Sequence, residues 1–150
     1  MSDNCTIFCL TNNLEQITAL ASKNASGKVE IINEGQTWEK IVVTNDKHQI
    51  TLSNLFRKEP GDKFSKLILS THNYFRNIET TADTQKQLVL NHVSNTETII
   101  GVIGEPIFSE SDKHFELIFD IAKVSNGIIF NGKEMLDDDG YVILKDDGTT

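Results

Sequence analysis

The pattern of apolar residues in the second half of the chain predicts a strand, a helix and a strand in close succession. Thr98–Gly104 is a short, β-branched apolar run. It predicts a strand covered on both faces, because a half-exposed strand would alternate with polar residues. A helix is predicted at Ser111–Asn126 and a further strand at Gly127–Phe130. The short connections between these segments predict a βαβ unit.

The predicted helix is apolar over much of its circumference. One stripe at helical spacing comprises Phe115, Ile118, Phe119 and Ala122. Because further apolar residues flank this stripe, we expect the helix to be buried on more than one side. Its close packing on the preceding strand would explain Gly101 and Gly104. Its end is predicted at Asn126-Gly127, since glycine accepts the left-handed conformation in which many helices terminate.

The remaining segments predict further strands and helices. Strands are predicted at Cys5–Thr11, Lys28–Asn33, Trp38–Thr44 and Gln49–Leu55. Helices are predicted around Leu14–Ala21, from a cap at Asp62 to Ile78, and around Leu88–Val93, where Thr84 and Gln87 have the form of a capping box. A hairpin turn is predicted at Asp137–Gly140, between Lys133–Leu136 and Tyr141–Leu144.

Together these segments predict a single α+β domain spanning residues 1–150. It has about four helices and a mixed or mainly antiparallel sheet of about six to seven strands, in the order βαβββααβαββ. The chain ends in Asp146-Asp147-Gly148-Thr149-Thr150, an unfinished turn. This ending leaves open that the domain is the N-terminal half of a longer protein.

The acidic composition indicates which classes of molecule the protein can bind. The formal net charge is −8 and the isoelectric point is about 4.9. This charge opposes binding to nucleic acid and to anionic lipid, both of which attract lysine and arginine. It leaves a basic protein as a suitable partner. No membrane-length apolar window and no signal-peptide pattern occur, so we expect no membrane contact and a cytoplasmic location.

Cys5 and Cys9 are the only cysteines. On one strand their α-carbons would be about 13 Å apart, which is too far for a disulfide, so we expect two free, buried thiols. A Cys–His nucleophile pair of Cys9 with His72 or His92 would require the fold to bring them together. The sequence contains no recognised catalytic motif, and we expect no cofactor or metal and, on balance, no enzyme activity.

Aspartates near the C-terminus are the main candidates for partner contact. The candidate partner-binding residues are Asp137, Asp138, Asp139, Asp146, Asp147 and Trp38. The aspartates would form a landing surface for a basic protein, apart from their role in the turn. Trp38, the only tryptophan, is either a core anchor or an exposed hot spot.

An ordered series of motifs resembles a known family. It consists of Cys5–Thr11 with Asn13-Leu14-Glu15, then Phe64-Ser65-Lys66, Ile100–Ile103, Asn126–Phe130 and Leu136–Leu144. This series is similar to the N-terminal half of an uncharacterised bacterial domain-of-unknown-function family common in Firmicutes. The resemblance implies a bacterial origin and, in longer members, a second helical half; it implies no catalytic residues.

Two functions follow as expectations. The first is a non-enzymatic protein-binding module of the bacterial cytosol, such as an acidic immunity or antitoxin-like protein that covers a basic partner. The alternative is a small-molecule-binding domain or enzyme with a pocket at the carboxyl ends of the central strands, near Gly104-Glu105-Pro106 and Asn131-Gly132.

Overall fold

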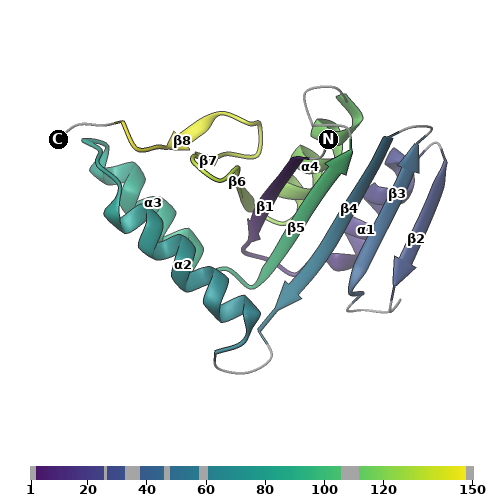
Figure 1. The fold of residues 1–150 in the computed structure, drawn as a ribbon, viewed down its shortest axis with the longest axis horizontal. Coiled ribbons are helices and arrows are strands. Elements are labelled where there is room, and N and C mark those ends of the chain that lie inside the picture. The colour runs from purple at the N-terminus through teal and green to yellow at the C-terminus, as the bar shows by residue number, and fades with distance from the viewer. Residues whose placement is uncertain are drawn as a thin grey trace.

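A computed structural model describes residues 3–25, 27–32, 38–45, 48–57, 61–105 and 112–147. These residues form an eight-stranded sheet flanked by four helices (Figure 1). The strands are β1 (Asp3–Cys9), β2 (Lys28–Ile32), β3 (Lys40–Asn45), β4 (His48–Phe56), β5 (Thr98–Glu105), β6 (Gly127–Phe130), β7 (Met135–Leu136) and β8 (Val142–Leu144). The helices are α1 (Leu14–Asn24), α2 (Lys63–Asn77), α3 (Asp83–Ser94) and α4 (Asp112–Val124). The α+β class is confirmed, with more strands than expected.

The N-terminal strand β1 lies in the interior of the sheet. The strand order is β2-β3-β4-β5-β1-β6-β7-β8, and every adjacent pair is antiparallel. Because β5 and β6 are both antiparallel to β1, they are parallel to each other. The segment β5-α4-β6 is therefore the predicted βαβ unit, with β1 inserted between its two strands.

Helices α1 and α4 cover one face of the sheet, which holds the larger core. Cys5, Ile7 and Cys9 of β1 point into this core, as expected for alternate residues of a strand. Trp38 lies there too and is 1% exposed. Its indole Nε1 donates to the Leu14 carbonyl at 3.3 Å, and its own carbonyl accepts from Asn54 Nδ2 at 2.9 Å. Trp38 is thus a core anchor that precedes β3, rather than part of that strand.

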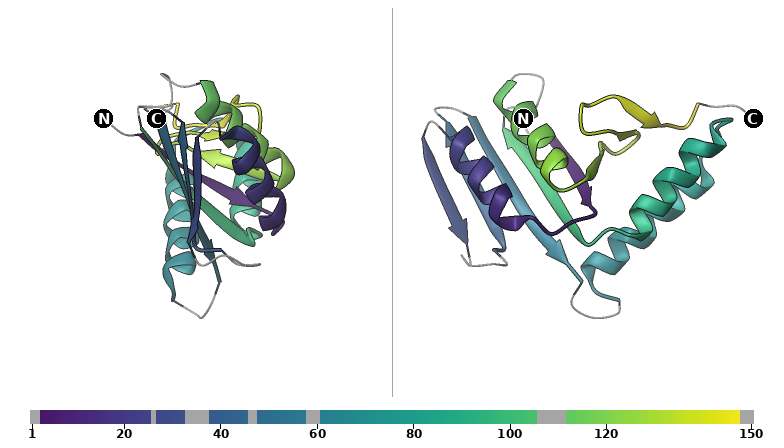
Figure 2. Two further views of the ribbon diagram at one scale, coloured as in Figure 1. Left: turned by 90° about the vertical axis from the view of Figure 1, so that its right-hand side faces the viewer. Right: turned by 180° about the vertical axis from the view of Figure 1, so that it is seen from behind.

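The α2–α3 hairpin packs on the opposite face, over β1 and the strands from β6 to β8 (Figure 2). Phe8, Ile99 and Ile128 meet Phe75 and Val93 in this second core. No described helix covers the same face of β2, β3, β4 and the upper part of β5 (Figure 1). Thr51 and Ser53 lie partly exposed there, and Ile103 is 49% exposed.

The helix ends correct two local predictions. Asp62 caps α2 as expected, since its Oδ1 accepts from Ser65 N at 2.8 Å. At α3 the N-cap is Ala82, whose side chain cannot cap, and the Thr84–Gln87 capping box is wrong. At the end of α4 the left-handed residue is Asn126, with φ of 49°, rather than Gly127. Gly127 is needed for space, because a Cβ there would lie 2.8 Å from Ile7 Cγ2.

The explanation expected for Gly101 is also wrong. A Cβ at Gly101 would approach nothing closer than Ser53 Cβ, at 3.9 Å, so no helix requires the glycine. The expected break at Pro106 and the expected helix start at Ser111 lie outside the described residues. In the described part of the chain, none of the helices has the length and apolar character required to cross a bilayer.

Candidate functional site

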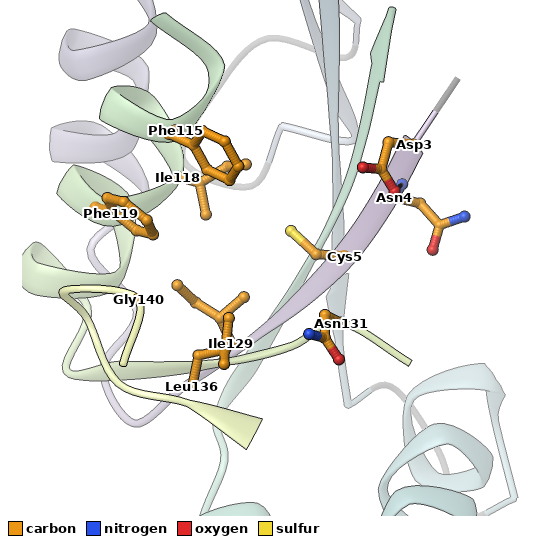
Figure 3. A pocket seen from close by; sticks show the side chains of 10 residues that line it. All are labelled: Asp3, Asn4, Cys5, Phe115, Ile118, Phe119, Ile129, Asn131, Leu136 and Gly140. Carbon is orange, nitrogen blue, oxygen red and sulfur yellow. Dashed lines mark hydrogen bonds between the residues drawn. The ribbon is translucent and has the colours of Figure 1, made fainter. Parts of the chain in front are cut away.

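A pocket of about 300 Å³ opens between α4 and the start of β1 (Figure 3). We call it the α4 pocket. Its walls are mostly apolar and consist of Cys5, Phe115, Ile118, Phe119, Ile129 and Leu136. Its rim is completed by Asp3, Asn4, Asn131 and Gly140. It therefore combines an apolar interior with polar groups at the mouth, which is the usual composition of a binding pocket.

Two phenylalanine rings on α4 form one wall. The rings of Phe115 and Phe119 are stacked, with centroids 5.7 Å apart and an interplanar angle of 20°. Phe115 is 37% exposed, whereas Ile118 behind it is 2% exposed. The buried stripe of α4 comprises His114, Leu117, Ile118, Ile121 and Ala122. The expected core stripe is therefore displaced around the helix, and Phe115 and Phe119 are left beside the pocket.

Cys5 lies on β1 across from α4, and Figure 3 shows its sulfur directed toward the helix. The thiol is buried and free, as predicted. Burial, followed by the neighbouring charge of Asp3, raises the pKa of Cys5 to about 12. The side chain thus remains a neutral thiol near pH 7 and contributes a soft, polarisable surface to the pocket, instead of a nucleophile.

The elements that form the α4 pocket carry many carboxylates, of which Asp3 lines the pocket itself. We call the set Asp3, Asp112, Glu116, Asp120, Asp137, Asp138 and Asp139 the acidic surface. The lysines described on the same segments are Lys113 and Lys123. Asp112, Glu116 and Asp120 follow one another at intervals of four residues, so they share one side of α4. This surface has an excess of negative charge next to an apolar pocket.

The turn at residues 137–141 connects the acidic surface to the pocket. Asp137 Oδ1 accepts from Asp139 N and from Tyr141 N, each at 2.9 Å, so Asp137 organises the turn. Lys123 Nζ lies 2.8 Å from Asp139 Oδ1 and donates to the Asp138 carbonyl at 2.8 Å. The hydrogen bond that Lys123 donates to Asp139, with the charges of Asp139, Asp138 and Asp120, raises the pKa of Lys123. Lys123 therefore tethers the turn to α4.

The five predicted aspartates do not form one cluster. Asp137, Asp138 and Asp139 adjoin α4, whereas Asp146 and Asp147 follow the other end of β8. There Asp147 N donates to the Glu79 carbonyl at 3.0 Å, and Asp147 Oδ2 accepts from Thr80 Oγ1 at 3.2 Å. Trp38 is enclosed in the core, so the expectation that it is an exposed partner-binding residue is wrong.

The sequence prediction missed the α4 carboxylates and the α4 pocket. The sequence held one signal for the pocket, because the helix carries more large apolar residues than a single buried face accommodates. The expected pocket position near Asn131 lies at this rim, at the carboxyl end of β6. Of the other residues expected there, Gly104 and Glu105 do not line this pocket, and Pro106 is outside the described residues.

The Cys9–histidine pair is excluded by the fold. Cys9 points into the core under α1 and α4, whereas His92 lies on α3, on the opposite face. His92 Nε2 donates to the Phe8 carbonyl at 2.8 Å. Burial raises the pKa of Cys9 to about 11, although a hydrogen bond with Ser125 lowers it slightly. His72 is on α2, which packs on the same far face as α3.

A second hollow lies at the opposite end of β5. It has a volume of about 390 Å³ and is lined by Asn12, Phe56, Arg57, Phe64, Thr96 and Glu97. Arg57 lies over the Phe64 ring at 5.3 Å, and this contact occupies its guanidinium face. Thr96 Oγ1 already donates to the His92 carbonyl at 3.0 Å. Arg57 and Thr96 thus already contact other residues of the protein, so we regard the α4 pocket as the stronger candidate.

Within the described ranges, no three or more histidine, cysteine, aspartate or glutamate side chains are arranged to hold a metal ion. Comparisons with protein-family models, with curated proteins and with solved structures found no match.

Proposed function

We propose that the chain is a non-enzymatic protein-binding module of the bacterial cytosol, which uses the acidic surface to bind a basic protein. An immunity or antitoxin-like protein, or an inhibitor of a basic partner, is the best form of this proposal. The observation that carries it is that the elements forming the apolar α4 pocket, namely β1, α4 and the turn at residues 137–141, also carry the carboxylates of the acidic surface.

Charge and apolar exposure coincide on this surface. Complementary charge accelerates the encounter of two proteins and selects against partners of the wrong sign. Phe115 is 37% exposed beside the pocket, and Tyr141 is 73% exposed next to Gly140 of its rim. Aromatic side chains are enriched in protein interfaces, and tryptophan and tyrosine are enriched among the few residues that dominate the binding energy. Aspartates that guide the partner and aromatic residues that hold it are thus both available.

The test compares two variants with equal net charge. Glu116→Gln with Asp138→Asn removes two charges from the acidic surface, whereas Glu15→Gln with Glu97→Gln removes two elsewhere. We expect wild type and the control to capture the same basic protein from a lysate of the source cells at low salt. The acidic-surface variant should lose that protein. Equal capture by both variants, or capture of acidic proteins only, would contradict the proposal.

A small-molecule-binding function is the second candidate. It is favoured by the volume of the α4 pocket, about 300 Å³, which lies within the range typical of ligand sites. A bound small molecule would stabilise the protein without any protein partner. The test measures the unfolding temperature of the purified protein with two cell fractions. A rise with the low-molecular-weight fraction, and none with the protein fraction, would support this candidate instead.

A further inference from the structure

The α4 pocket has the size of a protein side chain. Apolar cavities of about 150 Å³ admit benzene, and this pocket is about 300 Å³. A phenyl or indole ring therefore fits with room for the atoms that attach it to a backbone. Phe115 of the pocket lining is 37% exposed, so the pocket borders solvent there and the occupant can enter without rearrangement of the sheet.

The walls suit an aromatic ring. Phe115 and Phe119 present one pair of stacked rings, and a third ring can add to them in an offset or edge-on arrangement. Cys5 places a neutral sulfur on the opposite wall, where sulfur–aromatic contact is favourable. Ile118 and Ile129 are each 2% exposed and form an apolar floor.

The mouth adds a preference for positive charge. Asp3 lies on the rim at the start of β1, and Asp139 immediately precedes the rim residue Gly140. Asp139 is partly neutralised by Lys123, while Asp138 and Asp120 add further negative charge close to Lys123. A group entering the pocket therefore passes carboxylates of two segments, and a cation attached to that group lies near them.

From these observations we propose that the α4 pocket receives an aromatic side chain of the basic partner, flanked in the partner sequence by lysine or arginine. This inference rests on the proposed function and adds the chemistry of the partner's anchor residue. The anchor fills the pocket, and its basic neighbours meet Asp3 and the aspartates of the turn at residues 137–141. Hot-spot residues commonly lie in well-packed pockets near the centre of an interface, inside a polar rim.

Three end-blocked tripeptides test the inference: lysine-phenylalanine-lysine, lysine-serine-lysine and glutamate-phenylalanine-glutamate. Each is titrated into the ¹⁵N-labelled full chain, and amide shifts are followed by NMR. We expect the first peptide to shift the amides of Ile118, Phe119 and Ile129. It should bind about ten-fold more tightly than the second peptide, from the burial of one ring. The third peptide should bind more weakly than the first because its charge matches that of the rim.

The outcomes distinguish the contribution of the aromatic anchor to binding from the contribution of the charged residues. Equal binding of the two lysine peptides, with shifts confined to Asp137–Asp139, overturns the anchor and leaves the proposed function intact. Equal binding of the two phenylalanine peptides overturns the charge preference and favours the small-molecule candidate. Failure of both lysine peptides to bind the acidic surface contradicts both proposals.

Two variants place the binding in the pocket. Cys5→Met adds a flexible side chain to the empty space, and it should reduce binding of lysine-phenylalanine-lysine to the level of lysine-serine-lysine. Phe115→Ser removes a ring from the wall at a 37% exposed position, where folding is less at risk, and should have the same effect. Leu88→Ser removes a 53% exposed apolar residue from α3 as the matched control, and it should leave binding unchanged. Loss of binding in Leu88→Ser, with binding retained by Cys5→Met and Phe115→Ser, would overturn the assignment of binding to the α4 pocket.

Discussion

Gly140 lies so close to the ring of Phe119 that a Cβ at this position would be 2.7 Å from Phe119 Cζ. The glycine belongs to the turn at residues 137–141, and the ring belongs to the wall of the α4 pocket. Gly140 also has φ of +87°, a conformation that L-residues with side chains rarely adopt. One residue thus joins the acidic turn to the pocket, through its backbone conformation and through its lack of a side chain.

Gly140→Ala should therefore destabilise the fold and also displace the Phe119 ring. Gly132→Ala is the matched control, because Gly132 has φ of +101° but nothing within 4 Å of a Cβ. Both substitutions introduce backbone strain, and only the first adds a steric conflict. We expect Gly140→Ala to lower the free energy of unfolding by about 1 kcal/mol more than the control. Urea denaturation measures the difference; equal losses would mean that the ring moves at no cost.

Two strand glycines provide a second matched pair. Gly127→Ala would place Cβ 2.8 Å from Ile7 Cγ2 and 3.4 Å from Ala122 Cα, inside the larger core. We expect it to cost about 1–3 kcal/mol by overpacking. Gly101→Ala makes only ordinary contacts with Ser53, to Cβ at 3.9 Å and to the carbonyl oxygen at 4.0 Å, so it should be neutral or stabilise by about 0.4–1 kcal/mol through the unfolded chain. Thermal unfolding measures the stability of both variants. A larger loss of stability in Gly101→Ala than in Gly127→Ala would contradict this account of the sheet.

The buried thiols predict a loss of stability at alkaline pH. In the unfolded chain a cysteine ionises near pH 9.0, whereas burial raises the pKa of Cys9 to about 11 and that of Cys5 to about 12. The unfolded chain therefore releases these protons first, and stability falls as the pH rises from about 9 toward 11 or 12. Each thiol contributes a slope of roughly 1.4 kcal/mol per pH unit in this window. Cys9→Ala should reduce the slope measured by urea denaturation; an unchanged slope would show that Cys9 ionises freely in the folded protein.

His92 predicts a loss of stability at acidic pH. Burial lowers the pKa of His92 below its usual value of 6.5, although its hydrogen bond to the Phe8 carbonyl opposes this shift. The unfolded chain therefore takes up the proton more readily, so the contribution of His92 is complete above about pH 6.5 and declines as the pH falls below it. His92→Gln keeps a donor for the carbonyl but does not titrate. The variant should show a weaker loss of stability between pH 7 and pH 5, and an identical loss would assign the effect elsewhere.

Much of the local structure was predictable, because it depends on residues close in sequence. The first strand and the cap at Asp62 follow from local patterns, and both are confirmed, with the strand at Asp3–Cys9 instead of Cys5–Thr11. The position of β1 between β5 and β6 was not predictable, since pairing across about a hundred residues leaves no periodic signal. Trp38 illustrates the same limit, because its burial depends on contacts with Leu14 and Asn54 from separate elements.

The candidate site was predicted only in part. Asp137, Asp138 and Asp139 stood out as a run of like charges, but their approach to α4 depends on Lys123 and on the close fit of Gly140. The pocket arises because Phe115 lies beside the buried stripe of α4, a rotation that helical spacing alone does not fix. Asp146 resembles the other aspartates in sequence, yet β8 separates it from them.

Hydrogen exchange with the captured partner tests the central claim most directly. The account predicts that binding slows exchange at the amides of Phe115 to Asp120 and Asp137 to Tyr141, while Thr51 and Ser53 on the uncovered sheet face keep their free rates. Protection confined to the strands β2, β3 and β4, with residues 137–141 unchanged, would contradict the assignment of the acidic surface as the binding site.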